Sequence, residues 1–262
     1  MSAPNPSPPW WKVALATTTG TLYIVFGTLL LASLAFVVAI VPPRGHWTFR
    51  VGRFWSRWLL RSSWVRLEVE GLDGLDPAGR YVFLANHQSL FDIPALFASV
   101  PGQTRFLAKR SLFRIPIFGW AIAAGGFIPV DRGDRSTARD SFEQAVRRLG
   151  AGVSIMIFPE ETRSLDGRVL PLRRGGFLIA LKSGLPIVPV GLEGTLAVQR
   201  RTSFLIRPGV VRVRYGRPGA AAEHSVKQLR GWMAETRQEI ARLAGAGLAD
   251  DDSPRASAGT GS

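Results

Sequence analysis

The sequence predicts a single α/β domain built on one core: a mixed, mainly parallel sheet with flanking helices, preceded by an N-terminal membrane helix and an interfacial amphipathic helix. Three observations predict it. Short apolar runs alternate with helical stretches from Glu68 to Pro218. No charged residue occurs from Val13 to Pro43. Arginines recur on one helical face between His46 and Arg66. A chain of 262 residues is long enough for one such core and an appendage.

Charge and cysteine content narrow the classes of function. The formal net charge is +14, from 33 Lys and Arg against 19 Asp and Glu. We therefore expect an anionic partner, either nucleic acid, anionic lipid or a phosphorylated substrate. The absence of cysteine excludes a disulfide scaffold, a thiol nucleophile and thiolate-held zinc. With only three histidines, a metal site built on several imidazoles is not expected either.

The first element is an apolar helix. Val13 to Val41 is rich in Leu, Val, Ile, Ala and Phe, and as a helix it is long enough to cross about 30 Å of hydrocarbon. A signal peptide has an apolar core of roughly 7 to 15 residues. This run is about twice as long, so we expect it to stay on the protein. The alternative is a buried core helix, and hydrophobicity does not decide whether the segment spans the bilayer or re-enters one leaflet.

The second element, His46 to Arg66, reads as a helix with a basic face. That face carries Arg50, Arg53, Arg57 and Arg61 at spacings of three and four. The opposite side carries Trp47, Val51, Phe54, Trp55, Trp58 and Leu59. Indole rings settle at headgroup depth while guanidinium groups meet lipid phosphates, so this pattern predicts binding to an anionic lipid bilayer. The alternative is a helix packed on the domain with a solvated charged face.

The distribution of basic residues predicts the orientation in the membrane. Arginine is concentrated after the apolar run and only Lys12 precedes it. The positive-inside rule therefore places the following domain at the cytoplasmic face of the cell membrane.

The remaining chain divides into strands, helices and a tail. Expected strands are Tyr81 to Ala85, Thr104 to Ala108, Gly126 to Val130, Val153 to Phe158, Ile187 to Gly191 and Val210 to Tyr215. Expected helices are Asp92 to Ser99, Ile117 to Ala124, Ser136 to Leu149, Gly176 to Ser183 and Val226 to Leu243. From Gly245 the apolar content is too low for folding. The expected organisation is a tail at 1–12, anchoring helices at 13–66, the main domain at 67–244 and a disordered tail at 245–262.

The segment from Tyr81 to Pro94 is the strongest candidate for chemistry. It reads as a buried strand, a polar turn and a helix that begins at Asp92, which puts His87 at the carboxyl end of a strand. A turn of this length brings Asp92 back beside the imidazole. Such a pair suits general-base chemistry, because the imidazole accepts a proton from an attacking hydroxyl and the carboxylate orients the ring. Ser89 lies in no Gly-x-Ser-x-Gly elbow and is interpreted as a turn residue.

Four blocks of sequence now carry a resemblance to a known family. Asn86 to Asp92 matches Asn-His-x-Ser-x-x-Asp, the first motif of the glycerol-phosphate and lysophosphatidic acid acyltransferases. The other three motifs are similar to Gly125–Arg132, Phe158–Ser164 and Leu185–Val190, in the family's order. The resemblance covers roughly Val65 to Tyr215. It implies a single α/β domain, His87 and Asp92 as base and orienter, acyl-CoA or acyl-carrier protein as co-substrate, and no metal or other cofactor.

The resemblance also implies where an acceptor phosphate binds. Lysophosphatidic acid carries nearly two negative charges on its phosphate, which calls for at least one guanidinium group. Arg132 and Arg163 are the candidates by motif, and each follows an expected strand at the same sheet edge as His87. Lys109, just past another expected strand, is a third candidate. Arginines on a solvated surface are the alternative interpretation.

Asn86, Glu160, Glu161 and Thr162 are expected to support the pocket. Glu161 departs from the family, whose third motif has glycine at this place. Its carboxylate adds negative charge near the phosphate pocket, or its side chain occupies a place where the backbone approaches the ligand. The departure bears on the identity of the acceptor and leaves the chemistry unchanged.

The function predicted on these grounds is transfer of a fatty acyl group to the free hydroxyl of lysophosphatidic acid, giving phosphatidic acid in phospholipid biosynthesis. The runner-up is the same chemistry on another lysolipid, such as a lyso-ornithine lipid or a glycolipid. A nucleic-acid-binding module explains the charge but leaves the apolar helix without purpose, and no recognition motif is present. A noncatalytic protein that shapes or tethers lipid explains the first 66 residues but not the four motifs.

Overall fold

A seven-stranded sheet forms the centre of the protein. The computed structural model describes residues 8–41, 45–131 and 135–250, with the backbone alone at 135–138. The strands follow the order β1-β7-β6-β2-β5-β3-β4. Their bounds are β1 Val65–Glu70, β2 Val82–Ala85, β3 Thr104–Lys109, β4 Ile128–Val130, β5 Ser154–Ile157, β6 Ile187–Glu193 and β7 Gly209–Tyr215.

The strand directions bring five carboxyl ends to one edge. β6, β2, β5, β3 and β4 pair in parallel, whereas β7 is antiparallel to β6 and β1 is parallel to β7. The mixed, mainly parallel sheet predicted from the sequence is therefore confirmed. The segments that follow β2, β3, β4, β5 and β6 all emerge at the same edge of the sheet, where open α/β folds bind their ligands.

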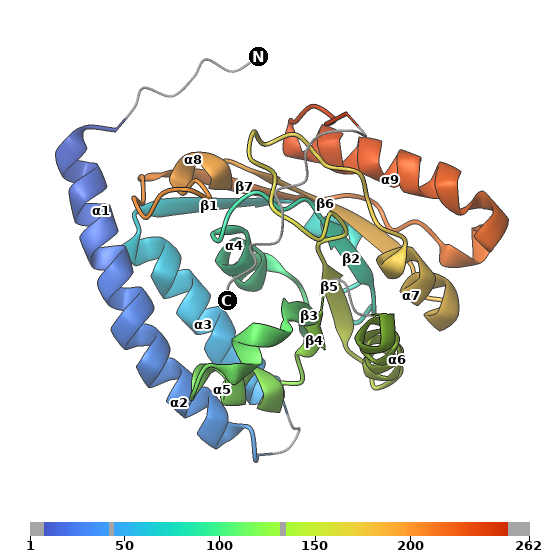
Figure 1. The fold of residues 1–262 in the computed structure, drawn as a ribbon, viewed down its shortest axis with the longest axis horizontal. Coiled ribbons are helices and arrows are strands. Elements are labelled where there is room, and N and C mark those ends of the chain that lie inside the picture. Colours follow the sequence, from blue (N-terminus) through green and yellow to red (C-terminus); the bar gives the residue numbers. More distant parts are fainter. Residues whose placement is uncertain (1–7, 42–44, 132–134, 251–262) are drawn as a thin grey trace.

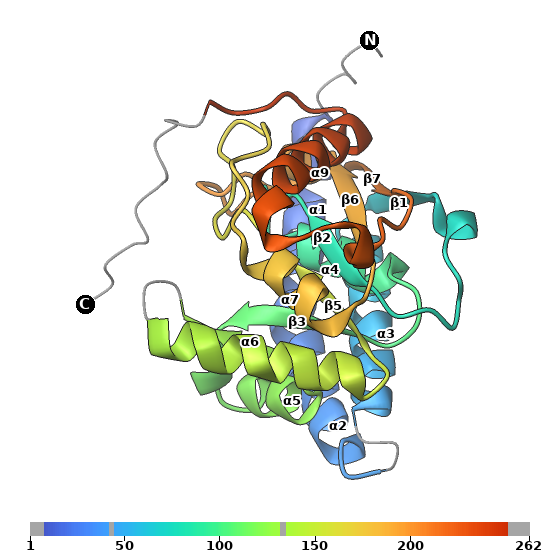
Figure 2. The same cartoon turned by 90° about the vertical axis from the view of Figure 1, so that its right-hand side faces the viewer.

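Helices cover both faces of the sheet (Figures 1 and 2). α6, α7 and α9 lie on one face, and α3, α4 and α5 lie on the other with α1 and α2 outside them. The helix bounds are α1 Trp10–Leu22, α2 Thr28–Val38, α3 His46–Ser62, α4 Asp92–Ser99, α5 Phe118–Ala124, α6 Arg135–Gly150, α7 Gly175–Ser183, α8 Thr195–Val198 and α9 Leu229–Ala244.

The two faces of β2 show why the sheet is buried on both sides. Phe83 and Ala85 belong to the apolar cluster under α3 and α4, and Val82 and Leu84 belong to the cluster under α6, α7 and α9. Successive side chains of a strand point to opposite faces, so a strand covered on both faces must be apolar throughout. The continuous apolar run before His87 follows from this central position.

The apolar N-terminal segment is one helix with a π-helical turn at Tyr23–Gly27. The helix Trp10–Val38 is long and apolar enough to cross a membrane. Of its most apolar stretch of 18 residues, 11% is buried against the rest of the protein. The domain touches this helix along its length. Thr17 bonds Ile206, Thr28 accepts a hydrogen bond from Trp55, and the carbonyl of Ala35 accepts one from Thr48.

Helix α3 differs from the expected division into a basic and an aromatic face. Its buried side carries Phe49, Ser56, Leu59 and Leu60, and Phe49 and Leu60 belong to the core of the domain. Trp47 and Trp58 are exposed together with Arg50, Arg57 and Arg61. Arg50 lies over the ring of Trp47 at 4.7 Å and Arg61 over the ring of Trp58 at 6.0 Å.

Arg53 does not lie on the exposed side of α3, because it donates to the carbonyls of Val100 and Gly102. The expectation that the arginines and the tryptophans lie on opposite sides of α3 is therefore wrong. The side that packs on the domain carries Phe49, Ser56, Leu59 and Leu60, and the tryptophans share the exposed side with arginines. The exposed side still combines aromatic rings with guanidinium groups.

Two further segments differ from expectation. β1 was not predicted, because its alternating Val65-Arg-Leu-Glu-Val-Glu70 is half charged and becomes an edge strand only by pairing with β7. Residues 245–250, expected to be disordered, run beside Val169, which bonds Gly247 and Ala249 through its backbone. Residues 251–262 lie outside the described part of the chain.

Candidate active site

The turn after β2 brings an imidazole and a carboxylate into contact. His87 follows the strand at Ala85, and Asp92 opens α4. Nδ1 of His87 lies 2.7 Å from Oδ2 of Asp92. Asp92 is fully buried and His87 is 9% exposed. The juxtaposition predicted from the five-residue spacing is confirmed, and it comes from the local path of the chain.

The Asp92 carboxylate closes the turn rather than capping its own helix. Besides the imidazole, Oδ2 accepts hydrogen bonds from the backbone N–H groups of Gln88 (2.7 Å) and Ser89 (2.8 Å). Because a carboxylate oxygen only accepts hydrogen bonds, Asp92 fixes the proton of His87 on Nδ1, and Nε2 is then the basic nitrogen. Among the described residues Nε2 has no hydrogen-bond partner, so it is available to a substrate.

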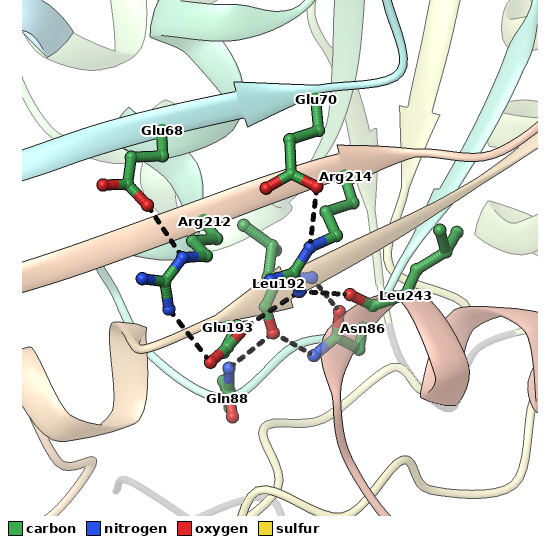
Figure 3. Close-up of polar contacts among 9 residues, drawn as sticks. All are labelled: Glu68, Glu70, Asn86, Gln88, Leu192, Glu193, Arg212, Arg214 and Leu243. Atoms are coloured by element: carbon green, nitrogen blue, oxygen red, sulfur yellow. Dashed lines mark hydrogen bonds and ion pairs between the residues drawn. The ribbon is translucent and has the colours of Figure 1, made fainter. Parts of the chain in front are cut away.

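Long-range contacts fix the turn from the β6 side (Figure 3). The side chain of Asn86 accepts from the N–H of Leu192 at 2.7 Å and donates to its carbonyl at 3.0 Å. Gln88 donates to the same carbonyl at 2.9 Å. Both neighbours of His87 in the sequence are thereby hydrogen-bonded to the backbone of one residue, Leu192, of the neighbouring strand. Asn86 thus holds the turn against β6, whereas its expected role in supporting the pocket stays a prediction.

A series of ion pairs across β1, β7 and β6 lies beside the hydrogen bonds of Asn86 and Gln88 to Leu192 (Figure 3). Glu193, next to Leu192, pairs with Arg212 at 3.3 Å and Arg214 at 2.8 Å, and these arginines also pair with Glu68 and Glu70. The groups are partly exposed, so water and salt screen these pairs and each one stabilises the fold only weakly. Their arrangement holds the register of the two strands that run opposite to the rest of the sheet.

Glu160 is a second buried acid behind the histidine. Its Oε1 accepts the backbone N–H of His87 at 2.7 Å and its Oε2 accepts that of Leu170 at 3.0 Å. Burial raises the pKa of Glu160 to about 8, with the two N–H groups acting in the opposite direction and Asp92 in the same direction. Glu160 thus holds the backbone of the turn, and its expected role in supporting the pocket stays a prediction.

The imidazole ring is held on its face as well as at its edge. It stacks on Phe158, the first residue after β5, with ring centroids 4.0 Å apart and planes 19° apart. The backbone N–H of Ser164 donates to the carbonyl of His87 at 2.8 Å. This contact also places Arg163, the preceding residue, next to the turn. Ring, backbone and carboxylate are therefore fixed before any substrate binds.

Arg163 and an arginine not predicted from the sequence, Arg201, lie near this pair. Burial lowers the pKa of Arg163, nearby Arg201 lowers it further, and the charge of Asp92 raises it. Ser89 donates to the carbonyl of Gln199 at 2.8 Å, which ties the segment containing Arg201 to the turn. Among the described residues neither arginine forms an ion pair with a carboxylate. Two guanidinium groups without acidic partners suit a phosphate.

The other phosphate candidates have different outcomes. Lys109 is exposed at the end of β3, which is separated from β2 by β5 and hence about 10 Å from it. Arg132 lies outside the described residues, whereas Asp131 before it pairs with Arg110 at 3.1 Å. Thr162 makes no side-chain hydrogen bond within the described chain, and the supporting role expected of it stays a prediction.

Glu161 adopts a left-handed backbone conformation with φ 59°. This region favours glycine, because a Cβ crowds the following carbonyl there. The glycine that the family has at this position is therefore explained by the backbone conformation. The Glu161 side chain is half exposed and its Oε2 lies 3.8 Å from Nε of Arg173, so the carboxylate forms an ion pair with that arginine.

No group of three or more His, Cys, Asp or Glu side chains that could hold a metal ion occurs in the described residues. The chemistry that the arrangement supports is proton transfer at Nε2 of His87, beside two guanidinium groups. An orienting carboxylate and a buried second acid complete it.

Comparison with known proteins agrees with this geometry. The sequence profile of the Acyltransferase family matches residues 66–193. The 1-acyl-sn-glycerol-3-phosphate acyltransferase of Pseudomonas aeruginosa is 31% identical over 232 residues, which are 84% of this chain and 87% of that protein. A chloroplastic enzyme of the same name from Brassica napus is 30% identical over 228 residues, 86% of this chain.

The chain spans 62–66% of the length of the first plant and algal relatives. Among solved structures, the 1-acyl-sn-glycerophosphate (LPA) acyltransferase of Thermotoga maritima superposes with a TM-score of 0.72 at 26% identity, over 89% of this chain and 95% of that one. With the motif order, the sheet and the buried His–Asp pair, these matches show that the chain belongs to the 1-acyl-sn-glycerol-3-phosphate acyltransferase family.

Proposed function

We propose that the protein transfers a fatty acyl group from acyl-CoA or acyl-carrier protein to the free hydroxyl of lysophosphatidic acid, giving phosphatidic acid. The observation that carries the proposal is the buried contact of His87 with Asp92, 2.7 Å, beside Arg163 and Arg201. The names of the relatives support the choice of acceptor.

The residues support a single displacement without a covalent enzyme intermediate. Nε2 of His87 accepts the proton of the acceptor hydroxyl as its oxygen attacks the thioester carbonyl. The carboxylate of Asp92 stabilises the imidazolium that forms. The C–S bond of the tetrahedral intermediate then breaks, and the leaving thiolate takes the proton from His87. A general base of this kind contributes a rate factor of roughly 10² to 10⁴.

Arg163 and Arg201 are proposed to hold the acceptor phosphate. A planar guanidinium makes two parallel hydrogen bonds to phosphate oxygens, which an ammonium group cannot do. Each lies in a segment that is hydrogen-bonded to the catalytic turn, so a phosphate held there is at a fixed distance from Nε2. Arg132 and Lys109 remain candidates on the resemblance alone.

Contacts along the N-terminal helix support a membrane placement. A helix that crosses the bilayer upright, with its domain in water, meets the domain only near one end. Here Thr17, Thr28 and Ala35 all form hydrogen bonds with the domain. We therefore propose that the helix and the side of the domain that contacts it lie together in the cytoplasmic leaflet of the cell membrane. The exposed Trp47, Trp58 and arginines of α3 would face anionic headgroups.

Turnover assays with several acceptors and both donors test the proposal. Lysophosphatidic acid, a lyso-ornithine lipid and a lysoglycolipid are each offered with acyl-CoA and with acyl-carrier protein. Arg163→Ala should lower kcat/KM for lysophosphatidic acid by roughly ten- to a hundredfold, because a charge-assisted hydrogen bond is worth about 1.5 to 3 kcal/mol. Arg163→Lys should recover part of it.

Acceptors without a phosphate provide the internal control. Their turnover should change little in Arg163→Ala if the guanidinium binds phosphate. Preference of the wild type for a phosphate-free lysolipid, with Arg163 unimportant, would instead assign the protein to that acceptor.

A further inference from the structure

The loop between α8 and β7, residues 199–208, carries two exposed apolar side chains. Phe204 is 93% exposed and Leu205 is 46% exposed, whereas the next residue, Ile206, is buried. Scattered exposed apolar residues are common on protein surfaces. The position of this loop and the charges around it therefore have to indicate whether Phe204 and Leu205 contact another molecule.

The loop is fastened to the apolar N-terminal helix. The backbone N–H of Ile206 donates to the hydroxyl of Thr17 at 3.0 Å, and the same hydroxyl donates to the carbonyl of Ile206 at 3.3 Å. A Cβ on Gly20 would meet Cδ1 of Ile206 at 2.9 Å, so helix and loop are in tight contact. Figure 1 shows this orange loop reaching from the sheet toward α1.

The surface of α1 next to the loop is itself apolar and uncovered. Trp10, Trp11, Leu15 and Leu22 are exposed large hydrophobic residues of this helix. Phe204 and Leu205 directly precede Ile206, which is bonded to α1 at Thr17, so the exposed apolar residues of loop and helix lie on two segments in contact. Exposed apolar side chains gathered on neighbouring segments suit a protein or membrane contact.

The charges of the loop favour a lipid partner. Arg200, Arg201 and Arg207 flank the apolar pair, and no acidic residue occurs from Gln199 to Pro208. Within the described chain none of the three forms an ion pair with a carboxylate. Apolar side chains flanked by unpaired guanidinium groups match the two layers of an anionic bilayer surface, acyl chains below phosphates.

We propose that this loop is a second membrane-contacting element, in which Phe204 and Leu205 enter the acyl-chain layer beside α1 while the exposed Arg200 meets anionic lipid phosphates. The inference rests on the membrane placement given under the proposed function. It adds that the loop tied to Ser89 of the catalytic turn also contacts the lipid.

Site-directed fluorescence on the full chain tests the inference. Because the sequence has no cysteine, Phe204→Cys provides one labelling site for an environment-sensitive fluorophore. Phe26→Cys, on the apolar helix and 66% exposed, reports the helix. Val226→Cys, 68% exposed, is the matched control; it lies just before α9, which is on the other side of the molecule from α1 (Figure 1). Each protein is reconstituted with vesicles of phosphatidylglycerol and phosphatidylcholine, with and without spin-labelled acyl chains.

The expected result is quenching by acyl-chain spin labels and a blue shift of emission at positions 204 and 26, with neither at position 226. Quenching at position 26 alone would overturn the loop inference and leave the placement of the helix standing. Absence of quenching at both would overturn the loop inference and the membrane placement together. A blue shift at position 204 that follows protein concentration without lipid would assign the loop to a protein contact instead.

Discussion

Replacing Asp92 by asparagine separates the charge of this residue from its shape. In the protein one oxygen, Oδ2, accepts from Nδ1 of His87 and from the N–H groups of Gln88 and Ser89 at 2.7 to 2.8 Å. The amide oxygen of asparagine can take its place and keep all three contacts. The new amide nitrogen then occupies the position of Oδ1, which is buried without a hydrogen-bond partner among the described residues.

The expected magnitudes follow from these contacts. An unsatisfied buried amide group costs about 1 to 3 kcal/mol of folding free energy. Loss of the charge removes the stabilisation of the imidazolium, so kcat/KM should fall by roughly 10² to 10⁴. The effect on rate should therefore greatly exceed the effect on folding.

The assay measures the release of CoA with a thiol reagent, to which the cysteine-free protein does not contribute. Thermal unfolding of each variant is followed by circular dichroism. His87→Ala is the reference, and the double variant with Asp92→Asn should be no slower than His87→Ala alone, because groups that act as one unit are not additive. A folded Asp92→Asn protein within about threefold of the wild-type rate would refute an orienting carboxylate, since general-base assistance is worth far more.

Three further predictions concern the support of the site. Glu161→Gly should raise the unfolding free energy by about 1 kcal/mol, because it removes a Cβ from a left-handed conformation; Glu161→Ala, which keeps the Cβ, should give no such gain. The unfolding free energy should fall as pH rises from about 5 to about 8, because folded Glu160, with its pKa near 8, retains a proton that the unfolded chain releases. Urea unfolding across this range should show a flatter dependence in Glu160→Gln, and an unchanged slope would exclude Glu160 as the cause. Asn86→Ala should lower the thermal midpoint by an amount equivalent to about 1 to 3 kcal/mol, since it leaves the N–H of Leu192 buried and unpaired. An unchanged midpoint would show that the hydrogen bonds between Asn86 and Leu192 do not stabilise the fold.

The sequence by itself determined the parts of this protein that depend on neighbouring residues. The apolar run of β2, the polar turn and the start of α4 at Asp92 lie within a dozen residues, so their periodicity sufficed to bring His87 and Asp92 together. The length of the N-terminal apolar helix and the alternation of strands and helices are likewise local properties. The order of the four motifs identified the family in the same way.

Only the tertiary structure decided the contacts between distant segments. Asn86 meets Leu192, Arg163 approaches Arg201, and Ile206 bonds Thr17 because the sheet order and its antiparallel β7 return those segments to each other. The side of α3 that packs on the domain was also decided this way, because an amphipathic pattern shows which residues are apolar but not which neighbour covers them. The left-handed backbone at Glu161 has the same origin, since surrounding contacts hold a conformation that its own side chain disfavours.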